Sequence, residues 1–177
     1  MQVQDESEMP IGNEIINQTD RASAIISSAY LEDKLTLMLR KYLTRDAPTI
    51  EIFERMTDAP GQLGALGTKT DLAYLLGLFG PLTHKDLKLI SKIRNQFAHL
   101  STVLDFGDQS ILNRCQELKV RDLLWSRYPA YKEYLEYPRP FTKEIARRAF
   151  IASVSLFSNK FTAIAKSPEI LKLDPLG

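Results

Sequence analysis

Cysteine and histidine are scarce in this sequence. Cys115 is the single cysteine among 177 residues, and His84 and His99 are the two histidines. A lone thiol excludes an intramolecular disulfide and favours a reducing compartment such as the cytoplasm. One cysteine and two histidines also fail to provide the ligand spacing of a zinc site. We therefore expect a cytoplasmic chain with no metal and no cofactor.

Long apolar runs and a strong charge imbalance are also missing. No apolar run approaches the roughly 20 residues that a membrane-spanning helix needs. The first ten residues, MQVQDESEMP, are polar and acidic, unlike a secretory signal. The formal net charge is +1, so any nucleic-acid binding has to come from a local basic patch. We expect no membrane partner.

Hydrophobic residues nevertheless make up 44% of the chain, which is enough for a substantial core. No segment shows the sustained alternation of polar and apolar residues that marks a half-buried strand. The sequence predicts an all-α, single-domain helical bundle of about five to seven helices, two of them long. We expect residues 1–18 to form a flexible N-terminal arm, residues 19–166 to form the domain, and residues 167–177 to form a C-terminal tail.

The first long helix is predicted near the start of the domain. Thr19 or Asp20 can cap it, and it reaches about Leu43. Its apolar positions form a broad stripe, which suggests contacts on more than one side and leaves room for a homodimer. Asp33 lies beside this stripe, where it either pairs with a cation such as Arg94 or occupies a solvated edge.

The second long helix is predicted at the end of the domain, from Thr142 to about Lys166. Lys143, Arg147 and Arg148 cluster near its start, where the helix dipole disfavours positive charge. These three cations are therefore candidates for binding a partner anion, and a solvated basic edge is the alternative. Six apolar residues at three- and four-residue spacing predict its core stripe: Ala146, Phe150, Val154, Phe157, Phe161 and Ile164.

Shorter helices are predicted between the two long ones. The first covers about residues 49–57. The loop over residues 59–67 carries three glycines, which close packing of backbone against a helix explains better than a phosphate-binding loop does. Thr68 and Asp71 are expected to cap the next helix, which reaches about Leu78.

Residues 83–100 are predicted to form the central helix of the bundle. Thr83 and Asp86 form its expected N-terminal cap, and Pro81 blocks extension upstream. An apolar stripe commits one side of this helix to the core: Ile90, Ile93, Phe97 and Leu100.

The opposite face of the central helix carries candidate binding residues. Asn95 and His99 are four residues apart and are predicted neighbours on it, whereas Arg94 lies between the two faces. The pair made with the preceding helix resembles a helix-turn-helix, but an antiparallel helical hairpin is the commoner form of such a break. Three lysines on this face are candidates for contacting a partner: Lys85, Lys88 and Lys92.

The region after the central helix combines a helix with an aromatic segment. A helix from Asp108 to Leu118 is expected to bury Cys115 as an inert core thiol. The aromatic segment that follows either packs on the core or on a second subunit, or stacks on single-stranded nucleic acid. It contains four tyrosines at a spacing of three: Tyr128, Tyr131, Tyr134 and Tyr137.

The segment over residues 63–78, LGALGTKTDLAYLLGL, followed by DLKLISKIRNQFAH over residues 86–99, resembles the mannitol operon repressor (MtlR) family of bacterial proteins. The match runs from the first long helix to about Leu118. The resemblance implies an all-α homodimer that regulates transcription as a repressor. It also implies a nucleic acid or a regulatory protein as the partner. It assigns no catalytic residues, so it favours a protein that is not an enzyme.

A shorter motif suggests an enzyme instead. The residues from Arg94 to His99 look like the Arg-x4-6-His signature of the HEPN superfamily, which includes dimeric, metal-independent ribonucleases. By that resemblance, His99 would act as general base or acid, Arg94 would stabilise charge on the phosphorane, and Asn95 would position the phosphate. The structural alternative is a histidine favoured by the dipole at a helix C-terminus, with Arg94 paired to an acid.

Overall fold

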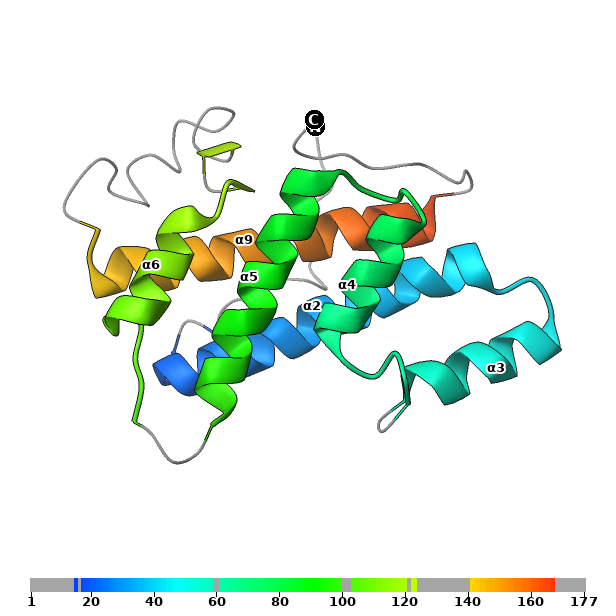
Figure 1. The fold of residues 1–177 in the computed structure, drawn as a ribbon, viewed down its shortest axis with the longest axis horizontal. Helices are drawn as coiled ribbons and strands as arrows, with labels where there is room; N and C mark the ends of the chain where they lie inside the picture. The colour runs from blue at the N-terminus through cyan, green and yellow to red at the C-terminus, as the bar shows by residue number, and fades with distance from the viewer. Residues whose placement is uncertain are drawn as a thin grey trace.

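The computed structural model describes residues 15, 17–58, 61–99, 103–120, 122–123 and 141–167. This part of the chain contains six helices and no strand, which confirms the predicted all-α class (Figure 1). The aromatic segment with Tyr128 to Tyr137 lies outside the described residues, as do residues 1–14 and 168–177. The helices are α2 (Asp20–Leu43), α3 (Ala47–Thr57), α4 (Leu66–Leu75), α5 (Pro81–Ala98), α6 (Gln109–Glu117) and α9 (Lys143–Lys166).

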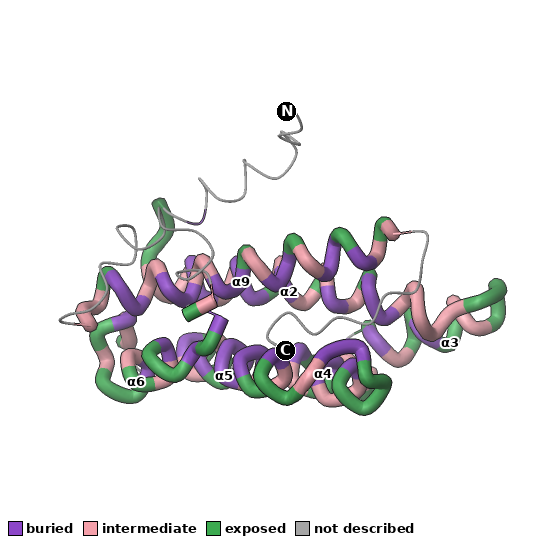
Figure 2. Tube along the Cα trace, turned by 90° about the horizontal axis from the view of Figure 1, so that it is seen from above, coloured by how far each residue is buried: buried purple, intermediate pink, exposed green. Residues whose placement is uncertain are grey.

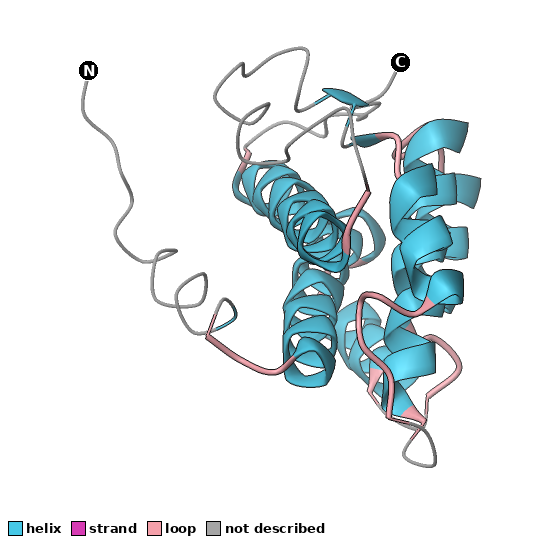
Figure 3. Cartoon of the chain, turned by 90° about the vertical axis from the view of Figure 1, so that its left-hand side faces the viewer, coloured by secondary structure: helices cyan, strands magenta, loops and turns pink. Residues whose placement is uncertain are grey.

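The helices are arranged in two layers. Figure 2 shows α2 and α9 together in one layer and α4, α5 and α6 in the other, while α3 extends from one end. Figure 3 shows the same two layers from the side. The core lies between them and takes large, fully buried side chains from three helices above all: Leu31, Leu35 and Met38 of α2, Ile90, Ile93 and Phe97 of α5, and Phe150, Phe157 and Phe161 of α9.

The two long helices run parallel. Near their N-termini, Lys143 Nζ lies 3.2 Å from Asp20 Oδ2, and near their C-termini, Lys41 Nζ donates to the carbonyl oxygen of Ile164 at 2.7 Å. The short helices therefore form the crossover that returns the chain to the start of the first layer (Figure 1).

The predicted limits of the long helices are confirmed. Thr19 caps α2 by accepting the N–H of Ala22, and Thr142 caps α9 by accepting the N–H of Ile145. All six residues of the predicted core stripe of α9 are buried. The limits of these helices can be predicted from nearby residues, because each helix has a side-chain cap and is long enough for its apolar stripe to be recognised.

The predicted start of the central helix is wrong. α5 begins at Pro81, where the fixed φ of proline suits the first turn and its missing N–H leaves no helix bond unmade. Thr83 and Asp86 are therefore inside the helix, and both are fully buried instead of forming a cap. The helix also ends at Ala98, so His99 is the residue that follows the last turn.

The predicted cap of α4 is also wrong. This helix begins at Leu66, two residues before Thr68, and no side chain caps it. Leu66 is only 5% exposed, so a helix that starts here buries its apolar side chain. The free energy gained by this burial outweighs the stabilisation that a side-chain cap at Thr68 would have given. α4 ends at Leu75, before the expected Leu78, and Gly77 then adopts a φ of 66°, which glycine accepts without strain.

The close packing expected of the glycine loop is found at Gly67. A Cβ built there would lie 3.3 Å from Ser91 Oγ and 3.6 Å from Lys88 Nζ, both on α5. Gly67 thus lets α4 approach α5 closely. Asp33 is exposed, in agreement with the solvated-edge alternative, and Arg94 bonds to Asn95.

Candidate functional site

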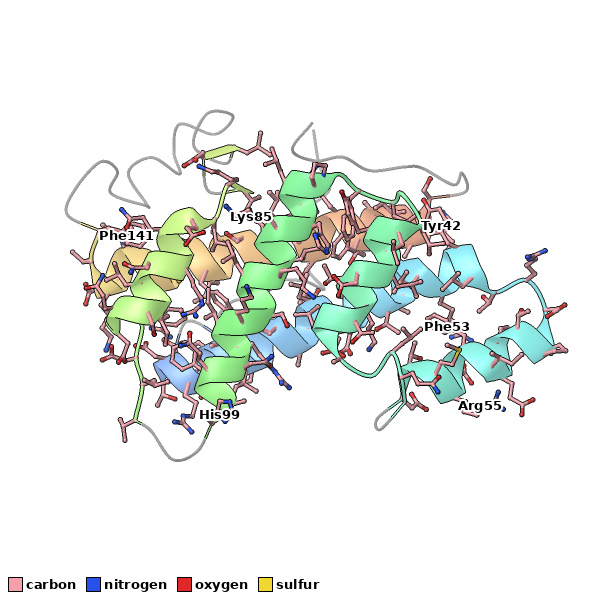
Figure 4. All side chains as sticks on the ribbon, viewed as in Figure 1. Tyr42, Phe53, Arg55, Lys85, His99 and Phe141 are labelled. Carbon is pink, nitrogen blue, oxygen red and sulfur yellow. The ribbon has the colours of Figure 1, made fainter. Side chains whose placement is uncertain are left out.

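The outer face of α5 carries positive charge without an exposed acid of its own. Lys85 and Lys92 are exposed and Lys88 is partly exposed, whereas the one acid of this helix, Asp86, is fully buried. Spacings of three and four residues place the three lysines on one side of the helix. We call Lys85, Lys88 and Lys92 the basic ridge; Lys85 is labelled in Figure 4.

Neighbouring helices neutralise two of these lysines. Lys88 Nζ lies 2.7 Å from Asp71 Oδ2 of α4, and Lys85 Nζ lies 3.7 Å from Glu117 Oε2 of α6. Lys92 forms no ion pair with any described residue. The ridge is therefore a surface with a net positive charge.

Asp71 also joins α4 to the first turns of α5. Its Oδ1 lies 2.7 Å from Nε2 of His84, and the imidazole of His84 stacks on the ring of Tyr74 with centroids 4.5 Å apart. The hydrogen bond from Lys88, with a smaller one from His84, lowers the pKa of Asp71, so the carboxylate is charged at neutral pH. An Asp–His contact can orient an imidazole for general-base chemistry. Among the described residues, no hydroxyl or thiol that could act as a nucleophile hydrogen-bonds this imidazole. The contacts of the cluster instead hold α4 against α5.

Large apolar side chains are exposed at the same end of the α4–α5 hairpin. Leu75 is 82% exposed, and Tyr74, Leu76 and Leu82 are between 39% and 41% exposed. We call these four residues the apolar tip. The tip adjoins the basic ridge because Tyr74 stacks on His84, which precedes Lys85.

The Arg94, Asn95 and His99 motif lies at the other end of α5. His99 is exposed just beyond the helix, in an extended conformation, and its backbone N–H donates to the carbonyl oxygen of Gln96. Figure 4 labels His99 at this end. Arg94 Nη1 donates to Asn95 Oδ1 at 3.1 Å. His99 is the C-cap residue of α5, four positions after Asn95, and the chain leaves the helical path beyond it.

The basic start of α9 is engaged within the chain. Lys143 Nζ lies 2.8 Å from Asp105 Oδ2 and 3.2 Å from Asp20 Oδ2, and hydrogen bonds to these two carboxylates raise the pKa of Lys143. Arg147 donates to Ser23 Oγ at 2.7 Å, and its Nε lies 3.5 Å from Asp20 Oδ1. Arg148 is partly exposed. These contacts tie the start of α9 to α2 and to the loop before α6.

A cleft of about 640 Å³ opens beside this network. Its lining contains both acidic and basic side chains, so the cleft does not favour an anionic ligand over a cationic one. Among the described residues, no group of three or more His, Cys, Asp or Glu side chains could hold a metal ion. The lining residues are Thr19, Asp20, Arg21, Val103, Leu104, Asp105 and Lys143.

The sequence interpretation missed the roles of Asp71, His84 and Tyr74. Asp71 was assigned to a helix cap, yet it contacts two residues of the next helix. A signal was present, because His84 and Lys88 are four residues apart and Asp71 and Tyr74 are three apart. Two facing pairs of this kind at the joined ends of a helical hairpin can form one cluster.

Comparison with known proteins gives one informative likeness. No family model matches the chain, and no curated protein does. The structure is similar to a chain in the X-ray structure of the MtlR–HPr complex from Escherichia coli, with a TM-score of 0.62 and 19% sequence identity. The likeness covers 86% of this chain and 99% of the other.

The fold is MtlR-like. The sequence resemblance to that family and the structural likeness thus agree at the level of the fold. No helix in the described part of the chain combines the length and the apolar character needed to cross a membrane.

Proposed function

We propose that this chain is a bacterial regulatory protein that acts by binding another protein. The observation that carries the proposal is the likeness, over 86% of this chain, to a protein solved in complex with HPr. The quoted family resemblance over residues 63–99 supports the same role. HPr is accordingly the first partner to test. Regulation of transcription in the cytoplasm is the wider role that we propose for such a complex.

A homodimer forms part of this proposal. The outward side of α2 supports it, because Leu37 is 47% exposed and Ala29 is also exposed on this long helix. Light scattering coupled to size-exclusion chromatography tests it directly. A mass of about twice the chain mass of 20.1 kDa is expected, and a monomer at about 100 μM would contradict it.

The partner is tested by isothermal titration calorimetry with two proteins. One is HPr from Escherichia coli, and the other is HPr from the organism that carries this chain. We expect a 1:1 complex with a Kd in the micromolar range, about −8 kcal/mol. The control is an HPr from an unrelated organism in which the charges of the surface residues have been reversed by mutation, and it should not bind. Absence of heat and of a shifted chromatographic peak with both HPr proteins at about 100 μM would count against the proposed partner.

A ribonuclease is the second candidate function. The position of this motif at one end of α5 favours it, because Asn95 and His99 are exposed and Arg94 is partly exposed, so RNA could reach all three. The test is cleavage of bulk RNA in EDTA by the wild type, by His99→Ala and by Arg94→Ala. Ser155→Ala, an exposed change on α9, is the matched control. Cleavage that both motif variants lose and the control keeps would establish a metal-independent ribonuclease, and no cleavage would leave the motif structural.

A further inference from the structure

The apolar tip concentrates exposed hydrophobic surface in one place. Seven large hydrophobic side chains are exposed among the described residues, and four of them, Tyr74, Leu75, Leu76 and Leu82, fall within nine positions. Backbone hydrogen bonds from Gly77 to Tyr74 and from Leu78 to Ala73 hold the turn closed. Such a cluster is a candidate interaction site, whereas single exposed leucines are ordinary.

The inner side of the same turn is fully committed to the core. Leu78 and Phe79 are each 3% exposed, and the ring of Phe79 stacks on Phe161 of α9 with centroids 6.1 Å apart. The turn therefore cannot rotate its outward leucines into the core without removing these residues from it. The exposure of Leu75 and Leu76 is built into the fold.

The charge beside the tip limits what can cover it. The basic ridge starts one turn after Leu82, and Lys92 at its far end has no acidic partner among the described residues. A second copy that used the same face would bring two surfaces of net positive charge together, because a two-fold interface uses the same patch on both subunits. For a nucleic acid, Tyr74 is the one aromatic side chain of this surface, and one face of its ring already stacks on His84.

We propose that the apolar tip and the basic ridge together form a docking surface for an acidic protein partner. The partner would present apolar side chains to Leu75, Leu76 and Leu82 and carboxylates to Lys85, Lys88 and Lys92. This inference rests on the proposed function and adds the surface and the chemistry of the partner. The tip supplies the desolvated contact, and the ridge sets orientation and association rate.

Synthetic peptides test the surface without a natural partner. The first probe is a labelled amphipathic helix whose leucine stripe is flanked by glutamates, and the second keeps the leucines and replaces each glutamate by lysine. Fluorescence anisotropy with the full chain should show binding of the glutamate peptide and at least about tenfold weaker binding of the lysine peptide. Raising the salt concentration should weaken the first interaction.

Point variants assign that binding to the proposed residues. Leu75→Ser and Lys92→Glu should each weaken the glutamate peptide about tenfold or more, because both positions are exposed and lie in the docking surface. Ile52→Ser and Arg55→Glu, both at exposed positions on α3, are the matched controls, and Figure 4 labels Arg55 well away from Lys85. Both controls should bind as the wild type does. Circular dichroism of each variant confirms that it is folded.

Four outcomes would overturn the docking surface. The first is equal binding of the two peptides, and the second is no effect of Leu75→Ser and Lys92→Glu. The third is tighter binding of single-stranded RNA or duplex DNA to the same residues. The fourth is peptide binding that is detected only after residues 168–177 are removed. The last outcome would mean that the chain itself covers the tip. Peptide binding without HPr binding would reject the proposed partner only, whereas HPr binding that both variants keep would reject the surface only.

Discussion

The carboxylate of Asp86 on α5 accepts the backbone N–H of Val120 at 2.7 Å. Its other oxygen accepts the N–H of Lys119 at 3.0 Å. Both N–H groups belong to the segment that follows α6, and Asp86 and Val120 are fully buried. Burial raises the pKa of Asp86, and the two hydrogen bonds partly offset this effect. One buried acid therefore satisfies two N–H groups that lie far from it in the sequence.

Replacing Asp86 by asparagine should destabilise the fold. The amide keeps one acceptor oxygen and places an NH2 group against the second N–H, so one buried donor loses its partner. We expect a loss of about 1–3 kcal/mol in the free energy of unfolding, measured by urea denaturation. Asp33→Asn, at an exposed position on α2, is the control and should change stability by less than about 0.5 kcal/mol. Equal stabilities of the two variants would refute this role of Asp86.

A second prediction concerns the ion pair that joins α4 to α2. Lys69 Nζ lies 2.8 Å from Glu32 Oε1, and their side chains are 6% and 20% exposed. Lys69→Met should cost about 2–4 kcal/mol, because it leaves a largely buried carboxylate without its partner. The double variant with Glu32→Leu should recover most of this loss.

A double-mutant cycle by thermal and urea unfolding measures this coupling. Lys92→Met removes an exposed lysine from α5 and is the control for loss of a positive charge. If the losses of stability in Lys69→Met and Glu32→Leu add up to the loss in the double variant, the pair is not coupled and the mechanism is wrong.

The long helices could be predicted from the sequence because their signals are local. Thr19 and Thr142 cap α2 and α9 within three residues of their own positions, and the stripe of α9 repeats over many turns. The starts of α4 and α5 could not be predicted in this way. Thr68 and Thr83 resemble caps, but burial of Leu66 and the fit of Pro81 to a first turn place each start upstream.

The candidate site was predictable only in part, for a related reason. Spacing alone placed Lys85, Lys88 and Lys92 on one face of a helix, since that relation lies within a single element. The contact of Asp71 with His84 depends on how two helices pack, which the pattern of one helix does not contain. The exposure of Leu75 could not be predicted in this way, because a leucine at helical spacing predicts burial unless the end of the helix is known.

A third prediction links Asp105 to the pH dependence of stability. The hydrogen bond from Lys143, with a smaller one from the Gly107 N–H, lowers the pKa of Asp105. A lowered pKa in the folded state stabilises the fold above the unfolded value, near pH 3.9, and this contribution is lost as pH falls through the folded pKa. Asp105→Asn should therefore be less stable than the wild type at pH 7 and nearly equal to it near pH 2.

The expected difference at pH 7 is no more than about 1 kcal/mol, because solvent screens a carboxylate that is 47% exposed. Urea unfolding at pH 7, 4 and 2 measures it. Asp58→Asn, at an exposed position after α3, should show no such convergence. A difference that stays constant across this pH range would show that the charge of Asp105 does not contribute.

The last prediction concerns the aromatic contact that holds the loop between α5 and α6. Phe106 is fully buried, and its ring lies 5.0 Å from that of Phe97 on α5 and 5.5 Å from that of Phe150 on α9. Phe106→Ala should cost about 3–5 kcal/mol, because it removes a buried ring and leaves a cavity between the two layers. Val103→Ala is the matched control on the same loop, and a side chain that is 99% exposed should contribute less than about 0.5 kcal/mol. Urea unfolding of both variants measures the difference in their free energy of unfolding. If Phe106→Ala is as stable as Val103→Ala, the loop is not anchored through this ring. Another contact must then fix the end of α5 that carries His99.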